Sequence, residues 1–180
     1  MARWPSGPFS TRRTGCYGCK RQSPSDGGCG VHGYPCTHWG VDTFAITPEI
    51  YAPEDGVVVS VADGSSPPFS GYGPGIVLMR GKSGLYHLLA HLDFGSIKVQ
   101  KGQSITEGML LGRYNAAFGH CHYEVRIKPT GPSDVNTIDP EKWLAAANGG
   151  GGGIGVFLLL GGLLAAGYFI AKSNVFAKSA

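Results

Sequence analysis

The chain has 180 residues, of which 30 are glycine, and its length suits one domain of roughly 100–150 residues with an appendage. Hydrophobic residues make up 42 % of the sequence and charged residues 15 %, which excludes a fully disordered chain. The net charge of +3 is too small for a dedicated nucleic-acid-binding protein, so we expect no nucleic acid among the partners.

Residues 1–37 are predicted to form a basic, cysteine-rich arm, because they carry five basic side chains and a single acidic one. The segment contains arginines but no long apolar stretch, so we expect no cleaved secretory signal there. Its four cysteines are Cys16, Cys19, Cys29 and Cys36. Their number and spacing suit a four-thiolate zinc site or two disulfides, and unlinked thiols are a third alternative. His32 could replace one thiolate as a ligand, although a loop histidine is the simpler interpretation.

Residues 38–144 are predicted to form an all-β domain with an antiparallel sheet. Extended, β-branched runs alternate with turns that contain glycine or proline, at a spacing typical of such domains. The expected strands fall within residues 51–64, 75–93, 96–115 and 120–131, and the turn GKSG divides the second of these runs. Only EKWLAAA, residues 141–147, has a helical pattern.

Two histidine motifs in this domain are candidate metal sites. In HWGVD, His38 and Asp42 lie four positions apart and can reach one ion if the chain turns at Gly40. In HCH, His120 and His122 alternate on an expected strand, so both imidazoles point to one face, roughly 6.5–7 Å apart. Each motif also has a plainer explanation, namely a loop surface in the first case and a half-exposed polar strand in the second.

Two further observations concern neighbouring residues. Glu124 and Arg126 share the face of the paired histidines, while Cys121 belongs to the opposite, apolar face of that strand. His91, in LLAHLD, ends an apolar strand, where a single histidine is more often a satisfied core residue than a catalyst. His87 lies four residues earlier and, on an extended strand, is expected on the same side as His91.

The last part of the chain predicts a single transmembrane helix. The run IGVFLLLGGLLAAGYFIA, residues 154–171, contains no charge and would extend about 27 Å as a helix, close to the roughly 30 Å of a bilayer core. The alternative, a buried core helix, would need protein on all of its sides. We expect a glycine-rich linker over residues 145–153 and a short basic tail over residues 172–180.

In order and context, these motifs resemble the LytM/lysostaphin-type zinc endopeptidases, which cut peptidoglycan cross-links. HWGVD resembles the family's H-x-G-x-D motif, and the following APEDGVV resembles A-P-x-x-G-x-V. LLAHLD resembles Y-A-H-L, with Leu89 in place of the tyrosine, and GHCHYEVR resembles H-L-H-F-E-V, with Cys121 between the histidines. IKVQKGQSITEGMLLG and IDPEKWL resemble two further segments, so the resemblance covers about residues 38–144.

The resemblance implies a role for each site residue. His38, Asp42 and His122 would be the protein ligands of a Zn²⁺ ion, with a fourth position left for water. His91 and His120 would not bind the metal but would orient the water, accept its proton or stabilise the oxyanion.

These features together predict a membrane-anchored zinc endopeptidase that hydrolyses peptide cross-links of peptidoglycan, with the segments 71–73 and 118–119 beside a groove for an extended peptide.

One alternative is a catalytically inactive domain that binds cell wall or activates another hydrolase. Another is a biotinyl- or lipoyl-type carrier module, which the histidine cluster disfavours. A wall-cutting domain on a membrane anchor suits a bacteriophage with an internal membrane, where it would act in cell-wall penetration beside other virion proteins. Otherwise we expect it in the bacterial inner membrane.

Overall fold

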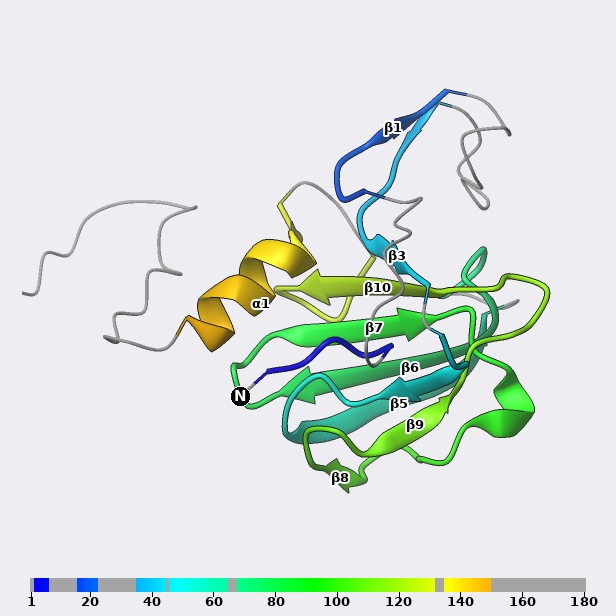
Figure 1. Cartoon of the computed structure of the whole chain (residues 1–180), viewed down its shortest axis with the longest axis vertical. Helices are drawn as coiled ribbons and strands as arrows, with labels where there is room; N and C mark the ends of the chain where they lie inside the picture. Colours follow the sequence, from blue (N-terminus) through cyan, green and yellow to red (C-terminus); the bar gives the residue numbers. More distant parts are fainter. Residues whose placement is uncertain are drawn as a thin grey trace, which may run out of the picture. The chain divides into compact units, whose positions relative to one another are not determined.

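The computed structural model of the chain describes residues 2–6, 16–22, 35–44, 46–64, 68–131 and 135–149. Figure 1 shows their arrangement. The strands are β1 (Lys20–Arg21), β2 (Cys36–Thr37), β3 (Val41–Thr43), β4 (Glu49–Tyr51), β5 (Gly56–Gly64), β6 (Gly73–Gly81), β7 (Tyr86–Ala90), β8 (Ser104–Ile105), β9 (Leu110–Arg113), β10 (Cys121–Arg126) and β11 (Thr137–Ile138). The helix α1 spans Pro140–Asn148, and a short 3₁₀ helix spans Phe94–Ser96.

Within the described residues, seven strands form the main sheet. Neighbouring strands follow the order β11–β10–β7–β6–β5–β8, and β3 also pairs with β10. Because β7 occupies one edge of β10, β3 and β11 lie along its other edge, beside its first and second halves respectively. The strands β1 and β2, and likewise β4 and β9, form two small sheets. Each of these pairings is antiparallel, which confirms the predicted antiparallel sheet.

The strand expected within residues 51–64 is β5, and the first residue of that segment, Tyr51, belongs to another strand, β4. Strand β4 ends at Tyr51 and pairs with β9, whereas β5 begins at Gly56 and pairs with β6. Pro53 lies between them and has no N–H to donate to a strand ladder. The predicted GKSG turn is present between β6 and β7, where Gly84 adopts a φ of 84° that favours glycine.

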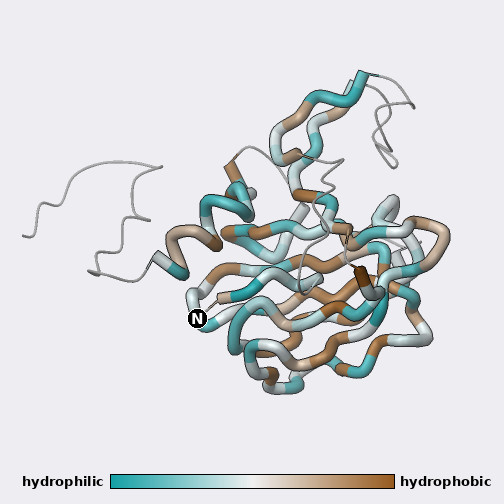
Figure 2. The backbone as a smooth tube through the Cα atoms, in the orientation of Figure 1, coloured by the Kyte–Doolittle hydropathy of each residue, from teal (hydrophilic) through white to brown (hydrophobic). Residues whose placement is uncertain are grey.

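Both faces of the main sheet carry buried apolar side chains, and Figure 2 shows hydrophobic residues along its strands. On one face, Val77, Leu89 and Tyr123 pack with residues of β4, β9 and α1, among them Ile50, Leu111 and Trp143. On the other face, Leu78, Leu88 and Ala90 form a smaller cluster with Phe69 and Ile76. All six residues of β10 are buried, so the half-exposed polar strand that we considered for the HCH motif is wrong.

The first residues of the chain pack on the same body as residues 38–144. The backbone N–H of Arg3 donates to the carbonyl of Pro53, and the N–H of Tyr51 donates to the carbonyl of Pro5. Ala2 and the side-chain amide of Asn148 exchange two hydrogen bonds of 2.9 and 2.7 Å. The predicted arm therefore contributes to the core at its beginning, through the buried Ala2 and the aromatic contact of Trp4 with Tyr123.

The helix α1 confirms the short helix predicted over residues 141–147. It begins after Asp139, whose side chain accepts a hydrogen bond from the N–H of Glu141, and Pro140 occupies its first turn. The helix runs to Asn148, so the first part of the linker predicted over residues 145–153 is helical. The predicted span 154–171 and tail 172–180 lie outside the described residues. Among the residues that are described, none of the helices has the length and apolar character to cross a membrane.

Candidate active site

The sheet register places two of the predicted ligands directly opposite each other. Asp42 on β3 is the cross-strand partner of His122 on β10, so both side chains project from the same face. His38 reaches them through a loop that passes very close to β10 at Gly40. A Cβ at Gly40 would lie 2.6 Å from the carbonyl oxygen of Tyr123 and 2.8 Å from the His122 ring. The absence of a side chain at Gly40 is therefore what lets the loop close over His122.

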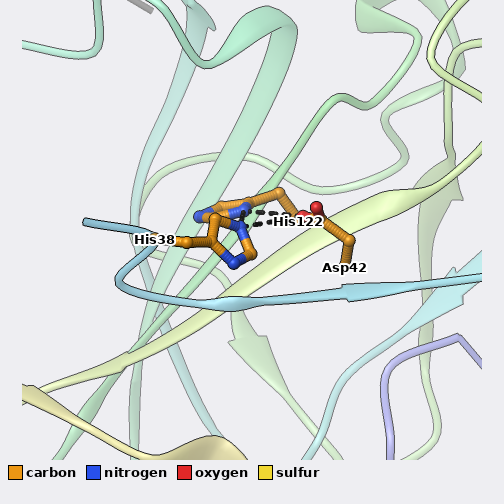
Figure 3. A group of neighbouring side chains, drawn as sticks. All are labelled: His38, Asp42 and His122. Carbon is orange, nitrogen blue, oxygen red and sulfur yellow. Dashed lines mark hydrogen bonds and ion pairs between the residues drawn. The ribbon is translucent and has the colours of Figure 1, made fainter. Parts of the chain in front are cut away.

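The three side chains point toward one another and form a nearly equilateral triangle of ligand atoms (Figure 3). The distance from His38 Nε2 to Asp42 Oδ1 is 3.1 Å, from His122 Nδ1 to Asp42 Oδ1 2.9 Å, and from His38 Nε2 to His122 Nδ1 3.0 Å. Two ligands of a tetrahedral zinc ion lie about 3.3 Å apart, given zinc–nitrogen bonds of about 2.05 Å. The triangle thus has the size that a single zinc ion requires, with one tetrahedral position remaining.

The hydrogen bonds around the triangle determine which nitrogen of each ring can bind a cation. His38 Nδ1 lies 3.0 Å from the carbonyl oxygen of Cys16, which can only accept, so this nitrogen carries a proton. His122 Nε2 likewise donates to Glu124 Oε1 over 2.8 Å. In the neutral rings, the lone pairs of His38 Nε2 and His122 Nδ1 therefore both face the carboxylate of Asp42. Three electron-pair donors that meet in a buried space favour a cation between them.

The electrostatics of the site agree with this preference for positive charge. Burial would raise the pKa of Asp42, but hydrogen bonds from the imidazoles of His122 and His38, when these rings are protonated, outweigh it and hold the pKa far below its usual range. Burial would lower the pKa of His122, but its hydrogen bonds to Asp42 and Glu124 outweigh that effect and raise the pKa to about 9. The chain therefore keeps the aspartate ionised and stabilises a positive charge beside it.

The two other predicted histidines lie next to the triangle. The ring centres of His91 and His120 are 4.9 Å apart, and the His91 ring lies 5.8 Å from that of His122. His91 Nδ1 donates to the carbonyl of Tyr72 over 2.8 Å, and His120 Nδ1 donates to the carbonyl of Phe118 over 2.7 Å. In both neutral rings the lone pair is therefore on Nε2. The Nε2 atom of His120 lies 3.6 Å from Asp42 Oδ1.

Burial keeps both of these histidines neutral. Desolvation, together with the neighbouring imidazoles, lowers the pKa of His91 to about 3. Desolvation also lowers the pKa of His120, although the nearby Asp42 acts in the opposite direction. At neutral pH each ring can accept a proton at Nε2.

The expectation that His87 lies on the same side as His91 is wrong. His87 is fully buried on the opposite face of β7, where it contacts Tyr123 and Glu54 rather than the triangle. The strand alternation ends at Ala90, and His91 adopts a φ of 62°, which turns its side chain out of the strand register. The stacking of Phe118 on the His91 ring, at 4.2 Å, accompanies this backbone conformation.

A buried network of hydrogen-bonded polar side chains holds the His122 ring in place. Glu124 Oε1 accepts hydrogen bonds from His122 and from the Tyr72 hydroxyl, both over 2.8 Å, and its Oε2 accepts one of 2.7 Å from Arg126 Nε. Glu124 and Arg126 are each 1 % exposed. The alternation of the strand placed both residues on the face of His122, but their role as its support was not predicted, because it depends on Tyr72 from another segment.

The structure also assigns part of the cysteine arm. Cys16 and Cys19 are joined by a disulfide, and Cys36 is disulfide-bonded as well. Cys29 and His32 lie outside the described residues. Cys121 is a buried free thiol on the apolar face of β10. The sequence does not predict the contact between Arg21 and Asp42, because these residues are 21 positions apart and lie in the arm and in the domain respectively.

Comparison with known proteins relates the chain to one family. The model of a family described as Peptidase family M23 matches residues 36–139. This range contains all five predicted site residues. None of the curated proteins matches the chain.

Several solved structures share the fold. The solution structure of lysostaphin, a peptidase from Staphylococcus simulans, has a TM-score of 0.54 and 23 % identity, over 79 % of this chain and 54 % of that one. The catalytic domain of the prophage-encoded M23 protein EnpA from Enterococcus faecalis has a TM-score of 0.50 and 24 % identity, over 77 % and 95 %. CbpA from L. salivarius REN has a TM-score of 0.58 and 18 % identity, over 81 % and 95 %. The chain thus spans about half the length of the lysostaphin structure, and at these identities the likeness shows the fold alone.

Proposed function

Because the chain belongs to peptidase family M23, a family of zinc metallopeptidases, we propose that it is a zinc-dependent endopeptidase that hydrolyses the peptide cross-links of bacterial peptidoglycan. The observation that carries this proposal is the convergence of His38, Asp42 and His122, whose ligand atoms all lie within 4.8 Å of one another. Two neutral histidines beside this group supply the acid–base chemistry that hydrolysis of a peptide needs.

In this proposal the metal ligands are His38 Nε2, Asp42 Oδ1 and His122 Nδ1. Two neutral imidazoles and one carboxylate are a ligand set that suits Zn²⁺ and leaves a position for water or substrate. When bound there, zinc supplies Lewis acidity, which polarises the scissile carbonyl and makes water more acidic. Glu124 holds the His122 ring through Nε2–H, which fixes the tautomer that ligation requires.

His91 and His120 are the proposed catalytic residues. Each holds its Nδ1 proton on a backbone carbonyl, so Nε2 of one ring can take the proton of the attacking water. The ring that has taken this proton can then stabilise the developing oxyanion or donate the proton to the leaving amine. The two rings meet edge to face, so a substrate carbonyl beside the triangle would lie within reach of both.

The proposed substrate approach lies beside His91 and His120. Phe118 stacks on His91 and is 40 % exposed, so it can contact a peptide that reaches the catalytic histidines. A Cβ at Gly73, whose φ is 80°, would lie 2.9 Å from His91 Nδ1 and 3.0 Å from Phe118. The lack of a side chain at Gly73 therefore leaves room for the rings of His91 and Phe118.

The second candidate function is a catalytically inactive domain of the same fold that binds cell wall or activates another hydrolase. Such a domain has no need of a complete ligand triangle or of two further histidines with lone pairs on Nε2. The retention of all five side chains in one cluster therefore favours the enzyme.

We test the enzyme proposal by metal content and wall hydrolysis. The purified full chain should contain about one zinc ion at the triangle and release soluble peptides from peptidoglycan, and a chelator should abolish the release until zinc is restored. His38→Ala and His122→Ala should lose both zinc and activity, whereas His120→Ala should keep its zinc and lose activity. A wild-type chain that hydrolyses peptidoglycan equally well without metal would contradict the proposal.

We also propose that residues 154–171 anchor the protein to a membrane, that the preceding glycines act as a tether, and that the setting is the internal membrane of a bacteriophage virion. The support is the uncharged 18-residue run in the sequence. The full chain should partition into lipid vesicles, and a chain truncated after Gly149 should remain in the aqueous phase. The protein should also be detected in purified virus particles, and a chromosomal cell-division context would contradict the virion setting.

A further inference from the structure

A segment that precedes the region matched by the Peptidase family M23 model contacts the triangle of His38, Asp42 and His122. Residues 16–21 contain the Cys16–Cys19 disulfide and the strand β1, and they lie before residue 36, where the family match begins. The side of the site that they cover carries His38 and Asp42.

The disulfide loop holds His38 by three hydrogen bonds. The N–H of Gly18 donates to the carbonyl of His38 over 2.7 Å, and the N–H of His38 donates to the carbonyl of Cys19 over 2.9 Å. The third bond, from His38 Nδ1 to the carbonyl of Cys16, fixes the ring in the tautomer that directs Nε2 to the triangle. Backbone and ring of this ligand are thus both positioned by the loop.

Arg21, at the end of the same segment, holds Asp42. Its Nη2 donates to Asp42 Oδ2 over 2.9 Å, and the two side chains are 11 % and 7 % exposed. The other carboxylate oxygen, Oδ1, is the one that contacts His38 and His122. The guanidinium therefore occupies one oxygen of the carboxylate and leaves the other aimed into the triangle.

The segment is itself attached at several points. Tyr17 donates its hydroxyl proton to the carbonyl of Thr137 over 3.1 Å, and its ring meets that of Trp39 edge to face. The strand β1 pairs with β2, so Arg21 lies opposite Cys36, two residues before His38. These contacts fix the segment relative to the two ligands that it touches.

We propose that residues 16–21 form the outer part of the metal centre, in which Arg21 is a positioning residue for Asp42 and the Cys16–Cys19 loop positions His38. The inference rests on the proposed zinc site and adds to it a dependence of zinc affinity on a segment outside the matched family region. Outer partners of metal ligands typically change metal affinity by about 10- to 100-fold when they are removed.

The experiment measures zinc affinity in the full chain by competition with a chromophoric chelator, and records the visible spectrum of the cobalt-substituted protein. Arg21→Ala should weaken zinc binding by about 10- to 100-fold and alter the cobalt spectrum. Arg21→Lys keeps the charge but not the forked geometry and should show a smaller loss. Lys20→Ala is the matched control, because Lys20 lies on the same strand but donates to Thr37 rather than to a ligand. It should bind zinc within about twofold of the wild type.

The double variant Cys16→Ser/Cys19→Ser tests the loop and should also weaken zinc binding. Thermal melting of the metal-free chains shows whether each variant folds, and Arg21→Lys decides the question if Arg21→Ala does not. An Arg21→Ala chain with wild-type affinity and cobalt spectrum would overturn the inference and leave the zinc site intact. Equal losses in Arg21→Ala and Lys20→Ala would also overturn it. A wild-type chain that takes up no zinc would overturn the proposed function, and with it this inference.

Discussion

His91 and His120 each bind a backbone carbonyl through Nδ1–H, and this bond decides which nitrogen can take part in catalysis. Because both pKa values are lowered by burial, both rings are neutral at the pH at which most peptidases work. Neither histidine contributes an atom to the triangle of ligand atoms. Loss of either ring should therefore remove proton transfer without removing the metal.

We expect His91→Ala and His120→Ala each to lower kcat by about 10²- to 10⁴-fold, which is the usual contribution of a positioned acid or base. Both variants should retain about one zinc ion per chain, measured by metal analysis after gel filtration. Loss of zinc together with activity in either variant would show that its histidine is a ligand instead.

Gly40 offers a test of how closely the His38 loop approaches β10. We expect Gly40→Ala to reduce both zinc affinity and stability, because the new methyl group would overlap the Tyr123 carbonyl and the His122 ring. Gly131→Ala is the control, since a Cβ there meets no atom within 4 Å and its φ lies outside the positive range. Equal melting temperatures and zinc affinities for the two variants would contradict the close approach.

Local sequence patterns single out the histidines and Asp42 but not the groups that hold them. A short spacing pairs His38 with Asp42 and strand alternation pairs His120 with His122, whereas only the resemblance to the LytM/lysostaphin-type enzymes implies which of them are ligands; the structure brings His38, Asp42 and His122 together. Arg21 and the Cys16 carbonyl were not predicted, because their contacts arise from the pairing of β1 with β2 across a long connection. Neither a backbone carbonyl nor a surface-type arginine carries any local signal for such a role.

At the scale of the element, β10 combines an apolar face with a buried polar row of His122, Glu124 and Arg126. Each member of the row bonds to the next, and Arg126 also donates to the Tyr72 hydroxyl and to the carbonyl of Thr130. The hydrogen bond from His122 and the charge of Arg126 outweigh burial and lower the pKa of Glu124 to about 2. A buried charge pair of this kind is costly to break on one side only.

We expect Glu124→Ala to reduce the free energy of unfolding of the metal-free chain by about 3–5 kcal/mol, because Arg126 would keep its charge without a carboxylate partner. Urea denaturation measures this loss. The control is Lys82→Ala, which breaks the exposed pair with Asp55 and should change stability little. A cost for Glu124→Ala no larger than that of the control would contradict the structural role of the row.

Most elements could be predicted from local patterns. The β-branched runs and glycine turns predicted the strands from β5 to β10, and Asp139-Pro140 marks the start of α1. The sequence could not show that β4 pairs with β9 rather than with a strand of the main sheet, since this pairing depends on residues some 60 positions away. It also could not show the turn at His91, where a positive φ interrupts the alternation of β7.

At the scale of the whole molecule, the core contains a buried histidine, His87, that takes no part in the candidate active site. The Tyr123 hydroxyl donates to His87 Nδ1 over 2.8 Å, and His87 Nε2–H donates to Glu54 Oε1 over 2.7 Å. Burial lowers the pKa of His87 from its ordinary value of 6.5, although Glu54 acts in the opposite direction. The folded chain therefore keeps His87 neutral at a pH where the unfolded chain protonates it.

This difference makes part of the stability depend on pH. The contribution of neutral His87 is complete above pH 6.5 and is lost as the pH falls below that value, at up to about 1.4 kcal/mol per pH unit. We expect His87→Gln to show a smaller decline in the free energy of unfolding between pH 6.5 and 5 than the wild type, measured by urea denaturation at each pH. Parallel declines in the two chains would contradict the assignment.

X-ray absorption at the zinc edge of the full chain, loaded with one equivalent of zinc, tests directly whether His38, Asp42 and His122 together bind one zinc ion. We predict nitrogen and oxygen neighbours at about 2.0–2.1 Å with the outer-shell signature of two imidazoles. His122→Ala should remove that signature. Sulfur neighbours at about 2.3 Å would place the ion at the cysteines instead and would contradict a zinc site at His38, Asp42 and His122.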